Sequence, residues 1–106
     1  MATKLTRTRS YHGIESVGDG RKVVASAGTA EALAASTACQ KVDIQAELDN
    51  TGIIVVGGST VVAAAGTRRG IALRAGDSYE FEIDNLADIY IDATVNGEGV
   101  TFTYYN

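Results

Sequence analysis

Nucleophilic catalysis needs a nucleophile, a base within hydrogen-bond reach and usually a third, orienting group, and the chain is poor in histidine and cysteine, which often fill the first two roles. The 106 residues include one histidine, His12, and one cysteine, Cys39. His12 lies in a polar N-terminal stretch that holds no base in a fixed geometry, and we expect Cys39 to be a buried small residue. A disulfide within the chain and a Cys/His zinc site are excluded. We therefore expect a protein that is not an enzyme and holds no cofactor or metal.

Acidic side chains collect in the last third of the sequence. Residues 75–106 hold seven Asp and Glu and no Lys or Arg, whereas residues 1–74 carry a net charge of +3, and together these give the formal charge of -4. Such an acidic third repels nucleic acid, so no nucleic-acid partner is expected. Loop oxygens of Asp84, Asn85 and Asp88 offer a weak calcium pattern. The solvated face of a sheet explains the same carboxylates, and it is the interpretation we favour.

Basic side chains gather at two places that we consider as partner-binding sites. Lys4, Arg7 and Arg9 lie in the N-terminal stretch, and Arg68 and Arg69 form a small basic group opposite in sign to the acidic third. Charges of this kind would steer the chain toward an acidic partner or a neighbouring subunit. A frayed terminus and a solvated loop are the alternatives, and both stay open at this point.

The elements expected to position these residues are strands, because apolar and polar side chains alternate with a period of two. Val42, Ile44, Ala46 and Leu48 form one such apolar row. Three further rows are Tyr79, Phe81 and Ile83; Ile89, Ile91, Ala93 and Val95; and Val100, Phe102 and Tyr104. Residues 22–26, 52–56 and 71–74 are additional strand candidates. Of these, 22–26 and 52–56 suit strands that are covered on both sides or lie near the centre of a sheet.

Turn residues separate these strands at short intervals, which is typical of a sandwich or barrel. Turns are expected at 49–52, 57–58 and 75–77, and Asn96-Gly97 is the strongest signal for a two-residue hairpin. Residues 29–35 contain helix formers, but we favour a hairpin around an Ala-Gly-Thr turn. The order of the strands stays open, because a Greek key and a meander share the same turns.

We therefore predict an all-β protein: a single β-sandwich or jelly-roll-like domain over residues 21–106, with an extended, flexible N-terminal arm over residues 1–20. The longest stretch without charges, 51–67, contains four glycines and is too short for a transmembrane helix. No apolar segment follows the basic N-terminus, which argues against a secretory signal. No membrane partner is expected.

Six motifs follow one another in an order that resembles small virion proteins of tailed bacteriophages. They are VDIQA from residue 42, DNTG from 49, IIVVGGS from 53, GIAL from 70, AGD from 75 and DNLADIYI from 84. The resemblance covers about residues 20–104 and rests on strands and turns. Ala75 stands where that family often has proline before the glycine of the turn.

The resemblance implies a compact β-domain with a structural role and no active-site residues. We therefore expect a capsid decoration or cement protein in the virion, assembled in the host cytoplasm. Its expected partners are itself, as a dimer or trimer, and the major capsid protein or other virion proteins. The alternative is a tail, baseplate or fibre component that binds a host surface glycan through two tyrosines expected to be exposed, Tyr90 and Tyr105, with nearby carboxylates.

Overall fold

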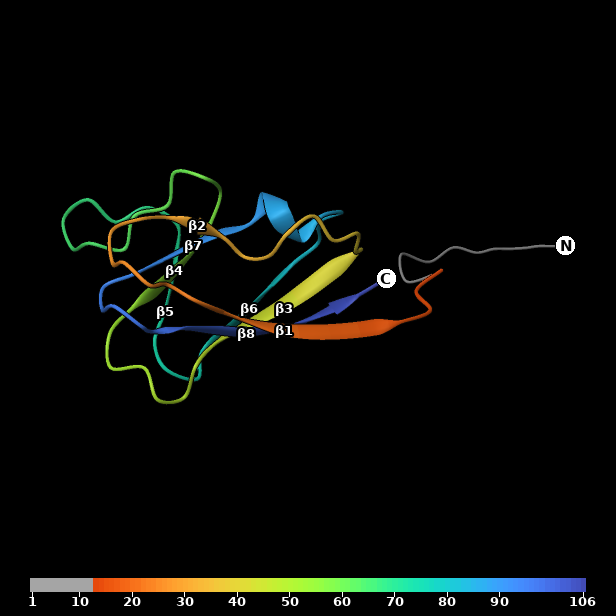
Figure 1. Ribbon diagram of the computed structural model, residues 1–106, viewed down its shortest axis with the longest axis horizontal. Coiled ribbons are helices and arrows are strands. Elements are labelled where there is room, and N and C mark those ends of the chain that lie inside the picture. The colour runs from red at the N-terminus through yellow and green to blue at the C-terminus, as the bar shows by residue number, and fades with distance from the viewer. Residues whose placement is uncertain (1–12) are drawn as a thin grey trace, which may run out of the picture.

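The computed structural model describes residues 13–106, and these form a nearly all-β protein with two antiparallel sheets (Figure 1). The all-β prediction is confirmed. One short 3-10 turn, η1 (Leu86–Asp88), precedes the seventh strand. The strands are β1 (Val17–Val23), β2 (Glu31–Ala32), β3 (Lys41–Ala46), β4 (Ile54–Gly57), β5 (Ile71–Leu73), β6 (Ser78–Phe81), β7 (Tyr90–Ala93) and β8 (Gly99–Tyr105).

The strands divide equally between the sheets, in the orders β1-β8-β3-β6 and β2-β7-β4-β5. Four of the antiparallel pairs are β1 with β8, β2 with β7, β3 with β6, and β4 with β5. The chain therefore runs as one long antiparallel double strand, with the β4–β5 connection at its tip. Among the described residues, all connections between successive strands except β4–β5 pass from one sheet to the other.

A single apolar core joins the two sheets. Val42 and Ile44 of β3 pack in the same buried cluster as Ile54 of β4, Ile91 of β7 and Phe102 of β8. These side chains lie on the inner face of each strand, as the period of two predicts. The sheets therefore pack face to face, and their inner faces bury the apolar rows that the alternation identified.

The second sheet is buried on its outer face as well. Val55 points away from the main core, yet it is fully buried in a second cluster with Val61 and Ala63 of the β4–β5 loop. The prediction of a covered or central strand is therefore confirmed for the part of 52–56 that lies in β4, from Ile54 onward. It is wrong for 22–26, because β1 is an edge strand that ends at Val23, and Ala25 and Ser26 are exposed. The first sheet carries polar side chains on its outer face.

Several strands are shorter than the alternation predicts. Leu48 belongs to the apolar row of β3 in the sequence but is 76% exposed, because β3 ends at Ala46 and the chain turns away. Val95 lies beyond the end of β7 and is exposed for the same reason. Tyr79 does point inward opposite Ile44, but it is 43% exposed because β6 is an edge strand.

The predicted hairpins are wrong in their partners, although the turns exist. Gly97 adopts a φ of +84° at the expected Asn96-Gly97 turn, but β7 and β8 belong to different sheets. The segment 29–35 contains no helix, and β2 pairs with β7 instead of forming a hairpin with the strand before it. Turn residues show where a chain reverses, whereas the sheet that receives the next strand depends on packing.

The first strand begins before the predicted domain boundary, which follows residue 20. β1 starts at Val17, and the segment ahead of it is fixed where Ser16 and Asn106 exchange backbone hydrogen bonds of 2.8 and 2.9 Å. Residues 17–20 therefore belong to the sheet and not to an arm. Residues 13–16 lead into this strand, and residues 1–12 of the predicted arm lie outside the described residues.

Candidate functional site

One edge of the first sheet is the free side of β1. At one end Ser16 bonds to Asn106, and at the other the Val24 N–H donates to the Glu98 carbonyl at 2.9 Å. Because such bonds alternate along an antiparallel pair, the even-numbered residues between these ends face β8. The N–H and C=O groups of Val17, Asp19, Arg21 and Val23 therefore point outward. Within residues 13–106 no strand lies on that side of β1.

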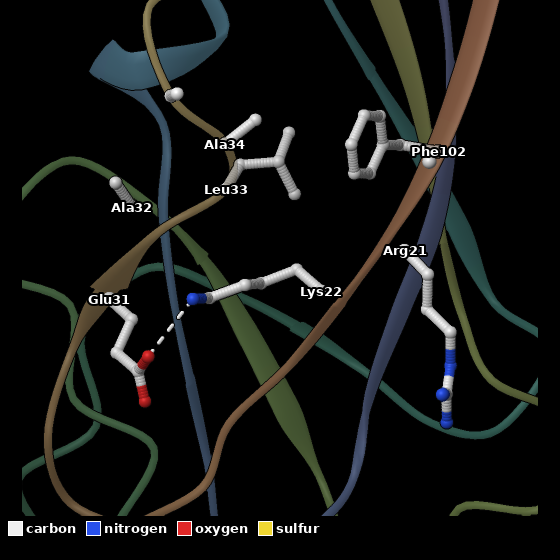
Figure 2. A pocket seen from close by; sticks show the side chains of 9 residues that line it. Arg21, Lys22, Glu31, Ala32, Leu33, Ala34 and Phe102 are labelled. Atoms are coloured by element: carbon white, nitrogen blue, oxygen red, sulfur yellow. Dashed lines mark ion pairs between the residues drawn. The ribbon is translucent and has the colours of Figure 1, made fainter.

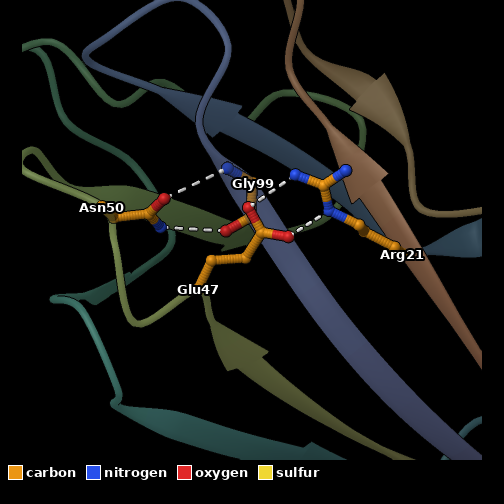
Figure 3. Close-up of polar contacts among 4 residues, drawn as sticks. All are labelled: Arg21, Glu47, Asn50 and Gly99. Carbon is orange, nitrogen blue, oxygen red and sulfur yellow. Dashed lines mark hydrogen bonds and ion pairs between the residues drawn. The ribbon is translucent and has the colours of Figure 1, made fainter.

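Opposite charges stand next to each other along this edge. Asp19 and Arg21 are both exposed on the outer face of the first sheet. The Arg21 guanidinium donates to the Glu47 carboxylate through Nε and through Nη2 (Figure 3). This hydrogen bond, followed by the charge of Glu47, raises the pKa of Arg21. Within residues 13–106 Asp19 makes no ion pair, so its carboxylate is available to a positive group from outside.

Two glycines on the inner side of β1 are covered by aromatic rings of β8. A Cβ atom on Gly18 would lie 2.3 Å from Cζ of Tyr104, and one on Gly20 would lie 2.5 Å from Cζ of Phe102. The rings thus lie where side chains of β1 would otherwise stand. Aromatic cover of this kind stabilises glycine in an edge strand. At these two positions β1 has no side chain of its own on its inner face.

A hollow of about 690 Å³ lies between β1 and the segment around β2 (Figure 2). Leu33 and Phe102 point toward each other across it, and the Lys22 ammonium pairs with the Glu31 carboxylate at 3.0 Å. Small side chains make up much of the remaining wall. The hollow is the gap between the sheets at their open side, and the ion pair bridges it.

The outer face of the first sheet carries a polar cluster around the end of β8. The Tyr105 hydroxyl donates to Asp43 at 3.1 Å, and this bond, with the charge of Asp43, raises the pKa of Tyr105. The Lys41 ammonium lies 5.0 Å from the centre of the Tyr105 ring and 3.2 Å from the Glu80 carboxylate. Tyr105 is half-buried by these neighbours, whereas the sequence suggested an exposed ring.

Tyr90, the other tyrosine considered for glycan binding, is far from this cluster in the fold. It lies on the outer face of the second sheet and packs, half-buried, against the cluster that contains Val55. Tyr105 lies on the outer face of the first sheet. The two rings therefore do not contribute to a common site.

Arg68 and Arg69 are exposed on the β4–β5 loop, which covers the second sheet. Arg68 Nε donates to the Ala63 carbonyl at 2.9 Å, and Arg69 is held by two backbone bonds with Val62. Beside them is a hollow of about 420 Å³ lined by small residues and by Arg68. The structure brings these two arginines together, away from β1, and their role as a partner site stays a prediction. Lys4, Arg7, Arg9 and His12 lie outside the described residues.

Asp92 is the charged residue whose position sequence reasoning missed. It alternates with apolar neighbours as if solvated, yet it is 1% exposed. Its Oδ1 accepts hydrogen bonds from the N–H groups of Gly28 at 2.9 Å and Ala93 at 2.8 Å, and its Oδ2 accepts one from Ala63 at 2.9 Å. The carboxylate thereby fastens two loops over the second sheet. No local signal identifies it, because its partners are backbone groups of distant segments.

A second acidic anchor holds the start of β8. Glu98 accepts from the Thr51 N–H at 2.7 Å, from the Thr51 hydroxyl and from the Gly52 N–H. These bonds, first among them the one from the Thr51 backbone, lower the pKa of Glu98. Asn50 adds to the same junction by donating to the Gly99 carbonyl at 2.9 Å (Figure 3).

One member of the weak calcium pattern, Asn85, has a structural role. Asn85 Oδ1 accepts from the N–H groups of Thr37 at 3.0 Å and Ala87 at 2.9 Å, so it caps η1. In the part of the chain that the structure describes, no three His, Cys, Asp or Glu side chains gather as metal ligands would. Cys39 is buried, as expected, and donates to the Ile83 carbonyl at 3.1 Å. Burial, with the charge of Asp84, raises the pKa of its thiol.

Comparisons of the chain with protein-family models, with curated proteins and with solved structures found no match. Across residues 13–106 no helix has the length and apolar character needed to span a bilayer.

Proposed function

We propose that this protein is a non-enzymatic structural component of a tailed-bacteriophage virion, and specifically a decoration or cement protein that binds the capsid surface as a homo-oligomer. The observation that carries the proposal is the open edge of β1, where four residues direct backbone hydrogen-bonding groups away from the domain. Strand addition at such an edge gives affinity through backbone bonds and needs no specialised side chains. The order of motifs that resembles phage virion proteins supplies the virion setting.

We further propose that the two sheets form a jelly roll. In support of this, the first strand pairs with the eighth, the second with the seventh, the third with the sixth, and the fourth with the fifth. A double strand of this kind, folded over to make two four-stranded sheets, is how eight strands give two Greek keys. Jelly rolls recur in viral capsid proteins, which fits the proposed setting as an analogy of fold.

Charge gives the proposal a second support. The exposed pair Arg68 and Arg69 and the basic residues Lys4, Arg7 and Arg9 would be attracted to an acidic capsid surface. The contribution of such exposed charges is mainly to the rate and orientation of binding, and it weakens as salt rises.

Co-sedimentation with undecorated phage capsids tests this function. We expect the full chain to pellet with capsids in a saturable manner. A chain lacking residues 1–12 keeps β1 intact, so it separates the contribution of the basic residues from that of the sheet. Reduced pelleting of this variant supports a role for Lys4, Arg7 and Arg9, and a full chain that never pellets with capsids overturns the proposed placement.

The second candidate is a tail or fibre component that binds a glycan, and one observation favours it. Tyr105 presents a ring beside the Asp43 carboxylate on the outer face of the first sheet, and aromatic rings with hydrogen-bonding groups suit a sugar. A glycan array with the wild-type chain and a Tyr105→Ala variant tests this. Binding that disappears in the variant would move the protein from the capsid to a host-attachment role.

A further inference from the structure

We propose that two copies of the chain pair through β1, antiparallel and in one register, with Gly20 facing Gly20 at the two-fold axis and Asp19 of each copy facing Arg21 of the other. This inference deepens the homo-oligomer part of the proposed function and rests on it. The backbone alternation limits the possible registers, the charges of the edge select among them, and the shape of the inner side is compatible with the result.

The direction of the backbone groups limits the possible registers. Val17, Asp19, Arg21 and Val23 point their N–H and C=O groups outward. Two antiparallel strands bond well only when such outward-directed residues stand opposite each other. Registers that place an odd-numbered residue opposite an even-numbered one are thereby excluded, since they leave these groups without partners.

Among the registers in which most of β1 overlaps, charge selects one. With Gly20 opposite Gly20, Asp19 faces Arg21 of the second copy, Arg21 faces Asp19, and Val17 faces Val23 at both ends. A shift of two residues in one direction places Asp19 opposite Asp19, and a shift in the other places Arg21 opposite Arg21. Directly opposed like charges destabilise a cross-strand pair, whereas opposite charges stabilise it. The strand is thus complementary to itself, as a two-fold interface requires.

The outer-face side chains have room to make these contacts. The Arg21 side chain is 62% exposed even though it holds Glu47. Guanidinium has five N–H donors, and the bonds to Glu47 use Nε and Nη2, so further donors are available to Asp19 of the second copy. The same Asp19 lacks an ion pair within residues 13–106. The pairing would therefore place three charged side chains in a row, with Glu47 and Arg21 of one copy followed by Asp19 of the other.

The inner side of the edge also suits a second strand. In this register Lys22 stands opposite Gly18 of the other copy, a residue with no side chain, where the Tyr104 ring covers the backbone. The 690 Å³ hollow lies beneath β1 on this side, with small residues such as Ala34 and Ala35 in its wall. The two hollows would meet near the two-fold axis. Because the proposed contact is one pair of strands, we expect a dimer that dissociates on dilution.

Charge reversal tests the register directly. Asp19→Lys places a lysine opposite Arg21 of the second copy, and Arg21→Glu places a glutamate opposite Asp19, so each variant alone opposes like charges at two positions. An equimolar mixture of the two variants, by contrast, forms a fully complementary heterodimer. We expect light scattering to show a wild-type dimer, at least a tenfold increase in the dissociation constant of each variant, and recovery of dimer in the mixture.

Matched controls carry the same changes of charge elsewhere. Asp88→Lys at the end of η1 and Arg74→Glu after β5 alter exposed residues outside β1, and we expect both to dimerise like the wild type. Circular dichroism melting of every variant checks that the monomers fold. Recovery of the dimer in the mixture is a second check, because mixing two misfolded chains would not restore an interface.

Three results would overturn the inference: a wild-type chain that stays monomeric at high concentration, a stable trimer, or a dimer that is insensitive to both reversals. Failure of the mixture to recover dimer would reject the register in the same way. These measurements use the protein without capsids. A chain that dimerises through β1 but does not bind capsids would support this inference and contradict the virion placement. A chain that binds capsids but does not dimerise through β1 would do the reverse.

Discussion

The first sheet ends in two edges that differ in charge. β1 exposes Asp19 beside Arg21, so a copy of the same strand meets opposite charges. β6, at the other edge, directs the backbone groups of Ser78 and Glu80 outward, because its odd-numbered residues bond to β3. The Glu80 carboxylate pairs with Lys41 of β3, and Glu82 follows directly after β6, so this second edge carries carboxylates and no base of its own. Charged residues on an edge strand discourage pairing, so the difference indicates which edge is protected and which is complementary.

The two edges also differ in how their inner sides are filled. β1 has glycines there, and the rings of Tyr104 and Phe102 reach over from β8. β6 supplies its own rings, with Tyr79 and Phe81 in an edge-to-face contact whose centroids are 4.9 Å apart. The stability of β1 therefore depends on side chains of the neighbouring strand β8, whereas β6 is covered by side chains of its own.

The largest effect is expected when the cover of β1 is removed. Phe102 is buried in the main core and lies over Gly20, so Phe102→Ala should lower the free energy of unfolding by about 3–5 kcal/mol. Tyr79→Ala at the β6 edge removes a ring that is 43% exposed and should cost well under half as much. Urea denaturation of both variants makes the comparison, and equal losses would mean that the two edges depend on their rings alike.

A smaller effect is expected when a side chain is added beneath the ring. Gly20→Ala forces a Cβ atom to within 2.5 Å of the Phe102 ring, and such overpacking costs about 1–3 kcal/mol. Gly58→Ala is the matched control, since a Cβ at Gly58 meets no atom within 4 Å. Thermal melting should show a lower Tm for the first variant and little change for the second. A Gly20→Ala chain as stable as the wild type would show that the ring moves aside freely.

The sequence predicted the strands better than their arrangement. The period of two located the inner faces of β3, β7 and β8, because side chains on one face of a strand must share one environment. It placed Asp92 on a solvated face, since nothing local shows that the loops carrying Gly28 and Ala63 fold over it. Likewise Asn96-Gly97 marked a turn, but which sheet receives β8 depends on the packing of both sheets.

The candidate site was less visible in the sequence than the fold. The prediction assigned the first residues of β1 to a flexible arm over residues 1–20. Gly18 and Gly20 favour a flexible segment when only their neighbours in sequence are considered. Their role depends on Phe102 and Tyr104, some eighty residues away, whose rings replace the missing side chains. Pairing between distant strands thus turned an apparent linker into the edge on which the proposed interface rests.

Salt should distinguish the charged part of the proposed β1 pairing from its backbone part. Asp19 and Arg21 are exposed, and the screening length falls from about 10 Å at 0.1 M salt to about 3 Å at 1 M. We expect the dissociation constant of the wild-type dimer to rise a few fold over this range. An Asp19→Asn, Arg21→Gln double variant should dimerise more weakly and with little dependence on salt. Equal salt dependence of both chains, measured by sedimentation equilibrium, would locate the relevant charges elsewhere.

The smallest effect concerns acid stability at the end of β1, where the Val24 N–H bonds to the Glu98 carbonyl. The hydrogen bonds from Thr51 and Gly52 lower the pKa of the Glu98 side chain in the folded protein. A lowered pKa means that the stabilisation is fully present above the unfolded value of about 4.3 and is lost as pH falls through the folded value. Glu98→Gln should therefore flatten the decline of Tm between about pH 5 and pH 3, because an amide does not titrate. Glu82→Gln, just after β6, is the control. Glu82 is exposed, and its replacement should leave the decline of Tm unchanged. A similar flattening in both variants would contradict the assignment of this acid sensitivity to the junction that Glu98 holds.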